Sequence, residues 1–479
     1  MNEFKKNKSK IKIKGIIGQK RAKRETERRK ELKQHKYQTG TQLTNIIRKT
    51  INNFFPDFFD RIREIEDFRK KSEYKLTELI TACIAMFLFK EGSRNALNND
   101  RDEENFKVNY ENLFHMRLPH MDTVDNVMRQ LKESELEKLK TDMIRNLLHK
   151  KSLHKFRFLG RFFVVAVDGT GIHTFSERHC DQCLTKTSKN GKTTYFHNVL
   201  EAKLICSNGF SISLATEWIE NPIGDFDKQD CERKAFKRLS EKIKKSFPRL
   251  PICITADGLY PSQPFFNICR KNNWHFIVTF KEGNLPSVWE KVRSLSGTVL
   301  IGNRNETIIH PGKKVTSAFR WINGIDYNGY KLNWLECAES TESTESTESI
   351  KTKKVETLCF VHLTDIAVSR DNVSEISRTG RLRWKIENEG FNTQKNHGYN
   401  LQHKYSRSSY IASKNYYQCL QIAHLINQLV ELSKNFAILL KGRSIKHLWK
   451  CLRGFFTYGL IIAEDLSFIL KKRSQIRFE

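Results

Sequence analysis

The sequence predicts an α/β protein in which one mixed β-sheet is flanked by helices and further helices lie toward both ends of the chain. Three observations indicate this. Apolar runs of strand length alternate with amphipathic helical segments in residues 156–283, strand-like runs dominate 284–370, and helical periodicity marks 41–155 and 406–479. The length of 479 residues allows two to four domains and at least one large core.

The chain begins with a basic arm, residues 1–40, that is either a solvated tail or a segment that contacts phosphates. The next region, 41–155, is expected to be helical. Its clearest helix follows Pro119, with Asp122 as the expected N-cap. One apolar face at helical spacing consists of Val124, Val127, Met128 and Leu131. Periodicity alone does not separate a DNA-end-binding module from a plain helical scaffold.

Strand and helix patterns then follow in the order strand, strand, strand, helix, strand, helix, strand. The expected elements lie at 161–168, 200–206, 210–219, 227–247, 251–257, 261–272 and 275–280. Three meandering strands followed by strand–helix crossovers predict a mixed sheet covered by helices. This is the element order of the ribonuclease H-like fold.

A β-rich insertion, residues 284–370, delays the helix expected after the fifth strand. Within it, a perfect three-residue repeat of Glu, Ser and Thr runs through Glu339–Ser349. Such a polar repeat cannot build a core, so we expect a flexible loop between two strands. The delayed helix lies in 371–405, which together with 156–283 completes the ribonuclease H-like region.

The charge of the chain indicates a polyanionic partner. There are 84 Lys and Arg residues against 54 Asp and Glu, a formal net charge of +30 that is spread along the chain. Such a field attracts DNA or RNA, because each neutralised phosphate releases counterions. An anionic membrane surface is the alternative, although the sequence shows neither a lipidation motif nor a long basic amphipathic anchor.

Further features favour the cytoplasm. The N-terminus lacks the apolar stretch of a signal peptide, and the most apolar segment, 76–89, is too short and interrupted to span a bilayer, which indicates a buried helix. Eleven cysteines lie scattered, as expected of buried thiols in a reducing compartment. Because neither a P-loop nor a GxGxxG motif is found, no nucleotide is expected as a cofactor.

Two aspartates are expected at the ends of neighbouring strands. Asp168 and Asp257 each follow an apolar run and each precede a glycine. Strands that end side by side would bring both carboxylates to one sheet edge, although Asp-Gly is also ordinary turn sequence. Arg383 and Glu387 lie four residues apart, so they share a helix face that can offer a guanidinium to a phosphate and a carboxylate to a metal. Two-metal phosphodiester chemistry needs such carboxylates, with Mg²⁺ or Mn²⁺ as the preferred ion.

A resemblance links these residues to a known family. The segment GRLRWKIENEGFNTQKNHGYNLQH, residues 380–403, resembles the C-terminal signature of the DDE transposases of bacterial insertion sequences. It is most similar to the branch with a Tyr-Arg-Glu-Lys motif and a β-strand insertion before the last catalytic residue. DGTGIHTFSERHCDQC, YFHNVLEAKL, ADGLY and FKEGN are also similar to that family, and the resemblance covers roughly residues 110–430.

The resemblance implies that Asp168, Asp257 and Glu387 hold two Mg²⁺ ions. Water would cleave one strand at the end of the element, and the freed 3′-OH would attack target DNA. Arg383 and Lys395 would contact phosphates near the cut, and a homodimer would act on the terminal inverted repeats at the bacterial nucleoid. The alternatives are an inactive DNA-binding relic and a nuclease of the same fold without strand transfer.

Two positions depart from the family motif. Gly380 stands where the motif has tyrosine, and Gln394 stands where it has lysine, with Lys395 beside it. In related enzymes these two residues help to hold a phosphate near a terminal hairpin, so the departures concern the hairpin route and not the carboxylates. Glu389 is a rival third carboxylate about 200° around an α-helix from Glu387, and the motif spacing favours Glu387.

A second group of ligand-type residues lies between the first two predicted strands. Cys180 and Cys183 are spaced as in half of a zinc knuckle, and His173, His179 and His197 could complete a set of four ligands for structural Zn²⁺. Because there is no second cysteine pair, a loop hairpin with two free thiols is the alternative.

Trp289 is a further candidate for DNA contact. Its indole could stack on an unpaired base near the DNA end. A tryptophan at such a position more often belongs to the core, so both interpretations stay open.

Overall fold

The computed structural model describes residues 39–479, except 225, 299–300, 311–312, 348–349, 462–475 and 479. The predicted basic arm, residues 1–40, lies outside the described residues apart from its last two. Within the described part, none of the helices combines the length and the apolar character needed to cross a bilayer.

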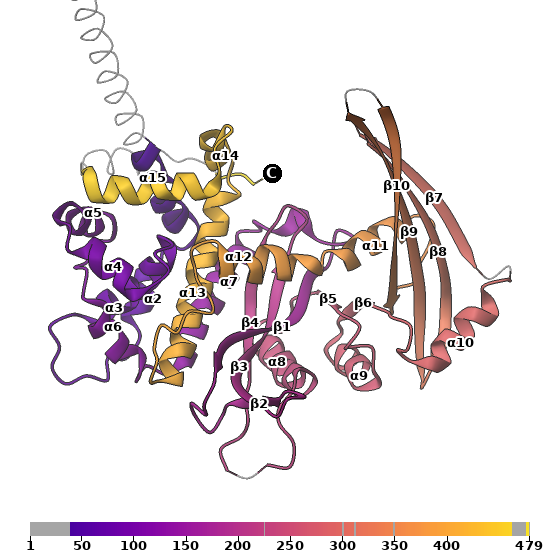
Figure 1. Cartoon of the computed structure of the whole chain (residues 1–479), viewed down its shortest axis with the longest axis horizontal. Helices are drawn as coiled ribbons and strands as arrows, with labels where there is room; N and C mark the ends of the chain where they lie inside the picture. Colours follow the sequence, from indigo (N-terminus) through magenta and orange to yellow (C-terminus); the bar gives the residue numbers. More distant parts are fainter. Residues whose placement is uncertain are drawn as a thin grey trace, which may run out of the picture.

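Helices that precede the sheet in the sequence and helices that follow it form one helical body, at the indigo and yellow end of the molecule (Figure 1). A helix over residues 39–54 comes first. It is followed by α2 (Phe58–Arg63), α3 (Leu76–Leu88), α4 (Arg94–Arg101), α5 (Glu104–Phe114), α6 (Met121–Met128), α7 (Glu133–His149) and the 3-10 helix η1 (His154–Phe156). The later members are α13 (Tyr410–Glu431), α14 (Lys434–Leu440) and α15 (Ile445–Tyr458). The buried helix predicted at 76–89 is confirmed, because every residue of α3 is buried where it packs along α13.

The helix predicted after Pro119 is α6, and its N-cap differs from the expectation. His120 is the cap, because its ring Nδ1 accepts a hydrogen bond from the backbone N–H of Asp122 at 3.3 Å. Asp122 therefore lies in the first turn, where its negative charge suits the helix dipole. The predicted apolar face is confirmed, since its four members are all buried, namely Val124, Val127, Met128 and Leu131.

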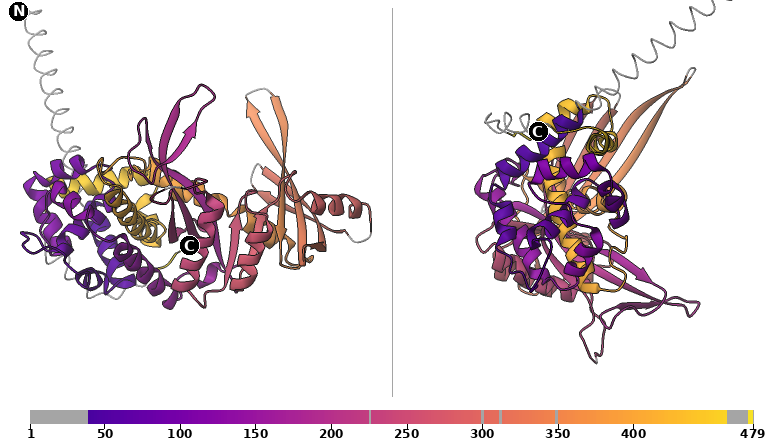
Figure 2. Two further views of the ribbon diagram at one scale, coloured as in Figure 1. Left: turned by 90° about the horizontal axis from the view of Figure 1, so that it is seen from below. Right: turned by 90° about the vertical axis from the view of Figure 1, so that its left-hand side faces the viewer.

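One mixed sheet of ten strands runs through the molecule. Its first six strands are β1 (Phe163–Phe175), β2 (Leu184–Thr187), β3 (Thr193–Ile205), β4 (Ser211–Ile219), β5 (Ile252–Ala256) and β6 (His275–Thr279). Five of them lie in the order β4–β3–β1–β5–β6, in which β1, β5 and β6 are parallel and β3 is antiparallel to both neighbours. β2 pairs with the first residues of β3, and Figure 2 shows this hairpin projecting from the body.

The predicted elements occur in the predicted order, but the sequence did not predict strand β2 between the first two of them, and several boundaries differ. β1 continues seven residues past Asp168 instead of ending there, because it stays paired with β3 as far as Phe175. β3 begins at Thr193 rather than at residue 200. The two crossover helices are α8 (Glu232–Ser246) and α9 (Gln263–Asn272). α8 therefore begins five residues later than the predicted start at 227.

Helices cover both faces of the sheet, and alternate residues of β1 contribute to two cores. Val165 and Val167 belong to the larger core, which α8 closes, while Val164 and Ala166 belong to a second core. The helical run that closes the second core crosses the sheet (Figure 1). It consists of α11 (Val373–Arg381), the π-helix η2 (Ile386–Asn392) and α12 (Thr393–Asn396). The helix predicted within 371–405 is thereby confirmed, with a π-helical stretch in its middle.

The β-rich insertion continues the same sheet. It consists of α10 (Pro286–Leu295), β7 (Gly302–His310), β8 (Lys313–Tyr327), β9 (Tyr330–Thr347) and β10 (Ile350–Thr364). β10 pairs antiparallel with β6, with Leu363 opposite Val278. The four long strands therefore extend the sheet beyond β6, and they stand at the end of the molecule opposite the helical body (Figure 1).

The prediction of a flexible loop at Glu339–Ser349 is wrong. The repeat continues strand β9 to Thr347, whose backbone pairs with Ile350 of β10. A strand ladder needs only backbone groups, and threonine suits a pleated strand, so a polar repeat can lengthen a hairpin beyond its core. The last two residues of the repeat, 348–349, lie outside the described residues.

Gly380 of α11 packs its backbone against His362 of β10. A Cβ built at Gly380 would lie 2.5 Å from atoms of the His362 ring, so a tyrosine has no room where the family motif has one.

We expect Gly380→Ala to lower the free energy of unfolding by about 1–2 kcal/mol, because overpacking outweighs the gain in helix propensity. Urea unfolding of the full chain measures this loss. Gly297→Ala is the matched control, because Gly297 is exposed with no atom within 4 Å of an added Cβ, and an equal loss in both variants would contradict the packing argument.

Candidate active site

Two neighbouring parallel strands place Asp168 and Asp257 at matching positions. The pairing register places Ala166 of β1 opposite Thr255 of β5. Continued for two residues, this register puts Asp168 opposite Asp257, which directly follows β5. Alternate residues of a strand point to the same face, and Ala166 belongs to the core beneath η2. Both carboxylates are therefore on the face of the sheet that η2 crosses.

The helical run across the sheet adds Glu387. Arg383 Nη1 lies 2.6 Å from Glu387 Oε1 and 3.7 Å from Asp168 Oδ2, so the guanidinium stands between the two carboxylates. Arg383 is only 6% exposed, and its guanidinium carbon lies 4.3 Å from the centre of the Trp384 ring. The helix face shared by Arg383 and Glu387 is thus the face directed at Asp168.

Glu389, the rival third carboxylate, points elsewhere. Its Oε1 pairs with Lys385 Nζ at 2.7 Å, and the side chain lines a groove between η2 and the strands β7–β10. Of the two glutamates, Glu387 is the one that faces Asp168.

Glu232 is a fourth carboxylate at this place, and the sequence analysis missed it. It lies in the first turn of α8, and its carboxylate fills the space that a Cβ on Gly169 would need. Burial raises the pKa of Glu232, and the charge of Asp257 raises it further. The sequence feature that could have indicated Glu232 is an acidic residue at the start of the helix after β4, where a carboxylate suits the helix dipole.

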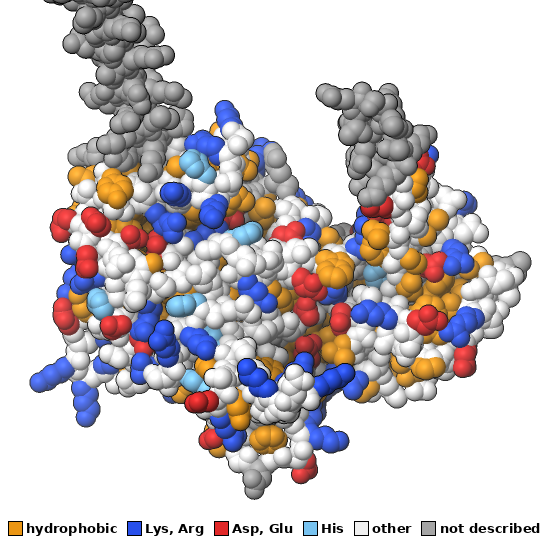
Figure 3. Space-filling model, viewed as in Figure 1, with side chains coloured by type: hydrophobic (Ala, Val, Ile, Leu, Met, Phe, Trp, Pro, Cys, Tyr) orange, Lys and Arg blue, Asp and Glu red, His pale blue; other side chains and the backbone are white. Residues whose placement is uncertain are grey.

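The carboxylates make the site strongly negative. Burial raises the pKa of Asp168 to about 7, with the charges of Glu387 and Glu232 adding to the rise and Arg383 opposing it. The buried hydroxyl of Tyr260, which faces the same charges, has no hydrogen-bond partner among the described residues. Figure 3 shows acidic side chains gathered between the β-rich extension and the rest of the molecule, in the region of η2, with Lys and Arg side chains around them.

This donor set fits Mg²⁺ or Mn²⁺, because its ligands are hard carboxylate oxygens whose mutual repulsion a divalent cation relieves. The carboxylate oxygens do not converge on one metal position. Among the described residues, they do not form a group of three whose oxygens all lie within 4.8 Å of one another. Arg383 takes the space between two of them, so metal binding requires its guanidinium to shift.

The residues predicted to contact phosphates lie on the same helical run. Lys395 is half-buried on α12, two turns beyond Glu387. Gln394 is fully buried, and its side-chain amide donates to Gln421 Oε1 at 2.8 Å and lies 2.9 Å from His424 Nδ1. The position at which the family has lysine is therefore part of the core, and Lys395 is the cation beside it.

The two tryptophans near the site differ in exposure. Trp289 stacks on Phe280, with ring centres 4.8 Å apart, and its indole N–H donates to the Lys281 carbonyl oxygen. Trp384, which the sequence analysis did not single out, is 51% exposed beside Arg383. Its ring has more free surface for contact with a base.

The predicted zinc ligands are only partly brought together. The Sγ atoms of Cys180 and Cys183 lie 3.6 Å apart, and they lie 3.4 and 3.3 Å from His197 Nε2. His179, Cys180 and His197 have ligand atoms that all lie within 4.8 Å of one another, a set that does not include Cys183. His173 lies opposite His197 in the β1–β3 register and is not a member of that set. All eleven cysteines have free thiols and eight are buried, as the sequence predicts.

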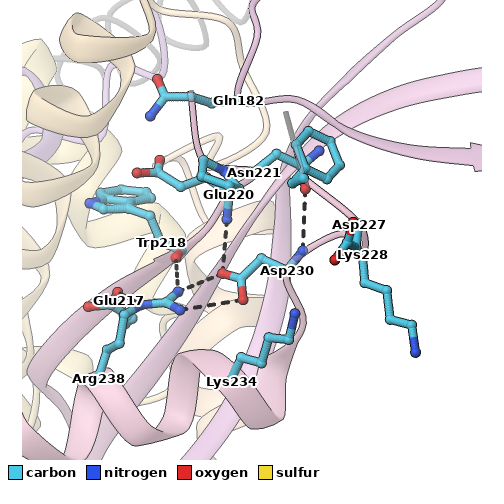
Figure 4. Close-up of a pocket in the computed structure, with 12 residues that line it drawn as sticks. Gln182, Glu217, Trp218, Glu220, Asn221, Asp227, Lys228, Asp230, Lys234 and Arg238 are labelled. Atoms are coloured by element: carbon cyan, nitrogen blue, oxygen red, sulfur yellow. Dashed lines mark hydrogen bonds and ion pairs between the residues drawn. The ribbon is translucent and has the colours of Figure 1, made fainter. Parts of the chain in front are cut away.

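A pocket beside this group is lined by several charges that are paired. Arg238 of α8 lies 2.6 Å from both Glu217 and Asp230 (Figure 4). Glu220 pairs with Lys414 at 2.6 Å. Such pairs position the segment between β4 and α8, and we assign no chemistry to them.

Comparison of the chain with protein-family models and with curated proteins finds no match.

The raised pKa of Asp168 gives a testable pH dependence. Its folded-state value of about 7 lies above the ordinary value of 3.8, so the folded protein binds this proton more tightly than the unfolded chain does. In metal-free buffer, the resulting stability is fully present below about pH 4 and is lost as the pH rises through about 7. Asp168→Asn should remove this loss and raise the melting temperature above pH 7.

Melting curves between pH 4 and 8 measure this effect, with the exposed Asp102→Asn as control. Added Mg²⁺ should raise the melting temperature of the wild type more than that of Asp168→Asn, because ligands stabilise the state they bind. Parallel pH curves for the wild type and Asp168→Asn would show that Asp168 has no raised pKa.

Proposed function

We propose that the chain is a DDE-type transposase that cuts and rejoins DNA at the ends of a bacterial insertion sequence. Asp168, Asp257 and Glu387 are the proposed ligands of Mg²⁺ or Mn²⁺. The observation that carries the proposal is that a helix far along the chain presents Glu387 to Asp168 of β1, while Asp257 directly follows β5, the parallel neighbour of β1.

The fold supports this proposal. The strand order β4–β3–β1–β5–β6, with only the last three strands parallel, is the order expected of a ribonuclease H-like sheet. The four-stranded extension stands between β6 and the helix that bears Glu387, which is where the resembling transposases have their β-strand insertion. Both points also agree with a nuclease of this fold.

The side chains have distinct proposed roles. When bound, two divalent ions would supply Lewis-acid stabilisation of the attacking and leaving oxygens of the phosphodiester. Asp168 must be ionised to serve as a ligand, so the site binds a cation best above about pH 7. Arg383 pairs with Glu387 and lies against Trp384, and the shift that metal binding requires would let its guanidinium donate N–H groups to a phosphate near the cut.

DNA is the proposed partner, through the terminal inverted repeats and the target. The net charge of +30 favours a polyanion, and Lys395 lies on the same helical run as Arg383. Joining two ends of one element requires two active sites, so we propose that a homodimer forms on DNA.

Metal-dependent cleavage of a labelled duplex that carries the flanking inverted repeat tests the proposal. With Mg²⁺, the wild type should cut at the element end. Asp257→Ala and Glu387→Gln should bind the duplex equally well but cut it at least about a hundredfold more slowly, because losing a metal ligand slows the reaction more than losing a residue that only supports a ligand. Glu232→Gln should also slow cleavage.

Asp326→Ala is the control, because Asp326 is an exposed carboxylate of β8 that pairs with Lys331. Binding without cleavage by every variant, the wild type included, would identify a DNA-binding relic. Cleavage without joining to target DNA would identify a nuclease.

The two tryptophans can be compared as base-stacking residues. We expect Trp384→Ala to weaken binding to an element end with unpaired bases by about 1–3 kcal/mol, the usual value for one stacked base. Trp289→Ala should instead lower the melting temperature, because its ring packs on Phe280. Fluorescence anisotropy with the end substrate and thermal unfolding separate the two effects, and a larger binding loss in Trp289→Ala would restore the stacking role predicted for Trp289.

A further inference from the structure

The loop between β1 and β2 brings two thiols and an imidazole together outside the carboxylate site. A turn, in which the Cys183 N–H donates to the Cys180 carbonyl oxygen, places both sulfurs on one side of the loop. His197 approaches them from β3, and its Nε2 lies 3.4 and 3.3 Å from the two sulfurs. Neither sulfur is within bonding distance of the other, at 3.6 Å.

These separations match the edges of a zinc tetrahedron. With Zn–S near 2.3 Å and Zn–N near 2.0–2.1 Å, tetrahedral ligands stand about 3.5–3.8 Å apart. The three measured separations, 3.3–3.6 Å, are at or just below that range. An ion bound by these three ligands would therefore need only small shifts of their side chains.

His179 is the candidate for the fourth donor, because one of its ring nitrogens lies within 4.8 Å of Cys180 Sγ and of a His197 ring nitrogen. Its Nε2 lies 2.6 Å from the Arg407 carbonyl oxygen, so this nitrogen carries the proton and donates it. The lone pair is then on Nδ1, which is buried and has no hydrogen-bond partner among the described residues. A histidine whose second nitrogen donates to a backbone carbonyl is the usual arrangement around a bound metal, because it fixes the tautomer and the ring orientation.

We propose that Cys180, Cys183, His197 and His179, through its Nδ1, bind one structural Zn²⁺ ion. All four positions of the tetrahedron are filled by protein, which leaves none for a substrate. Two thiolates neutralise the charge of the ion, which suits a position where Cys183 is 1% exposed.

The ion would join three segments that are distant in the sequence. The β1–β2 loop and β3 supply the ligands, and the hydrogen bond from His179 reaches Arg407, just before α13. The ring of Tyr410 at the start of α13 stacks on His197, with ring centres 3.8 Å apart. On the other side, Asn221 donates to the Cys183 carbonyl oxygen at 2.8 Å. The site would therefore anchor the projecting β2–β3 hairpin to the helical body.

Metal analysis of the full chain, purified under reducing conditions without chelator, tests this. We expect about one zinc per chain in the wild type and in Cys359→Ser, an exposed cysteine of β10 that serves as control. Cys183→Ser should lose the metal, and His179→Ala should bind it at least about tenfold more weakly. Zinc-free wild type, or Cys183→Ser with a full complement of zinc, would overturn the proposal, and unchanged affinity in His179→Ala would remove His179 from the ligand set.

A second measurement uses only the wild type, so it tests the proposal even where a variant fails to fold. Wild type stripped by a chelator and titrated with Co²⁺ should develop thiolate-to-cobalt absorption and the visible bands of tetrahedral cobalt, and should melt at a higher temperature when reloaded with Zn²⁺. Absence of these bands in protein with free thiols would also overturn the proposal. Neither readout involves DNA, so the result is independent of the proposed transposase activity.

Discussion

The parallel pairing of β1 with β5 is the constraint on which the candidate active site depends. Successive side chains of Phe163–Val167 point alternately into the two cores. The same alternation determines the face of the sheet to which Asp168 points. A slip of one residue between the strands would send Asp168 and Asp257 to opposite faces. The helices on the two faces are positioned relative to this pair, with Glu232 presented from α8 and Glu387 from η2.

The site concentrates like charge at a cost in stability. Asp168 reaches a pKa of about 7 because its carboxyl group is buried beside Glu387 and Glu232, and one guanidinium, that of Arg383, offsets only part of the repulsion. Nothing in the packing of the cores requires these charges. Groups that are unfavourable for folding persist where the surrounding structure holds them and a ligand makes use of them, which is the physical reason to regard this site as functional.

Much of the architecture follows from local patterns in the sequence. Period-two and period-3.6 runs predict the strands and helices from β1 to β6 in order, except β2, and they predict the buried helix α3 and the helix that carries Arg383 and Glu387. The apolar runs before Asp168 and Asp257 predict two neighbouring strands, although β1 continues past Asp168, and a Cys-x-x-Cys spacing predicts a close pair of sulfurs. Each of these features depends on residues within a few positions of one another, so the chain determines them before it folds.

Other features were decided only by the tertiary structure, because they depend on segments far apart in the chain. The crossover after β4 brings Glu232 to Gly169, and the register of the helical run turns Glu387 rather than Glu389 toward Asp168. Pairing with β10 makes a strand of a polar repeat that has no core of its own, and pairing with β6 joins the insertion to the central sheet. The sequence by itself therefore determined which chemical groups are available, and long-range pairing decided which of them meet.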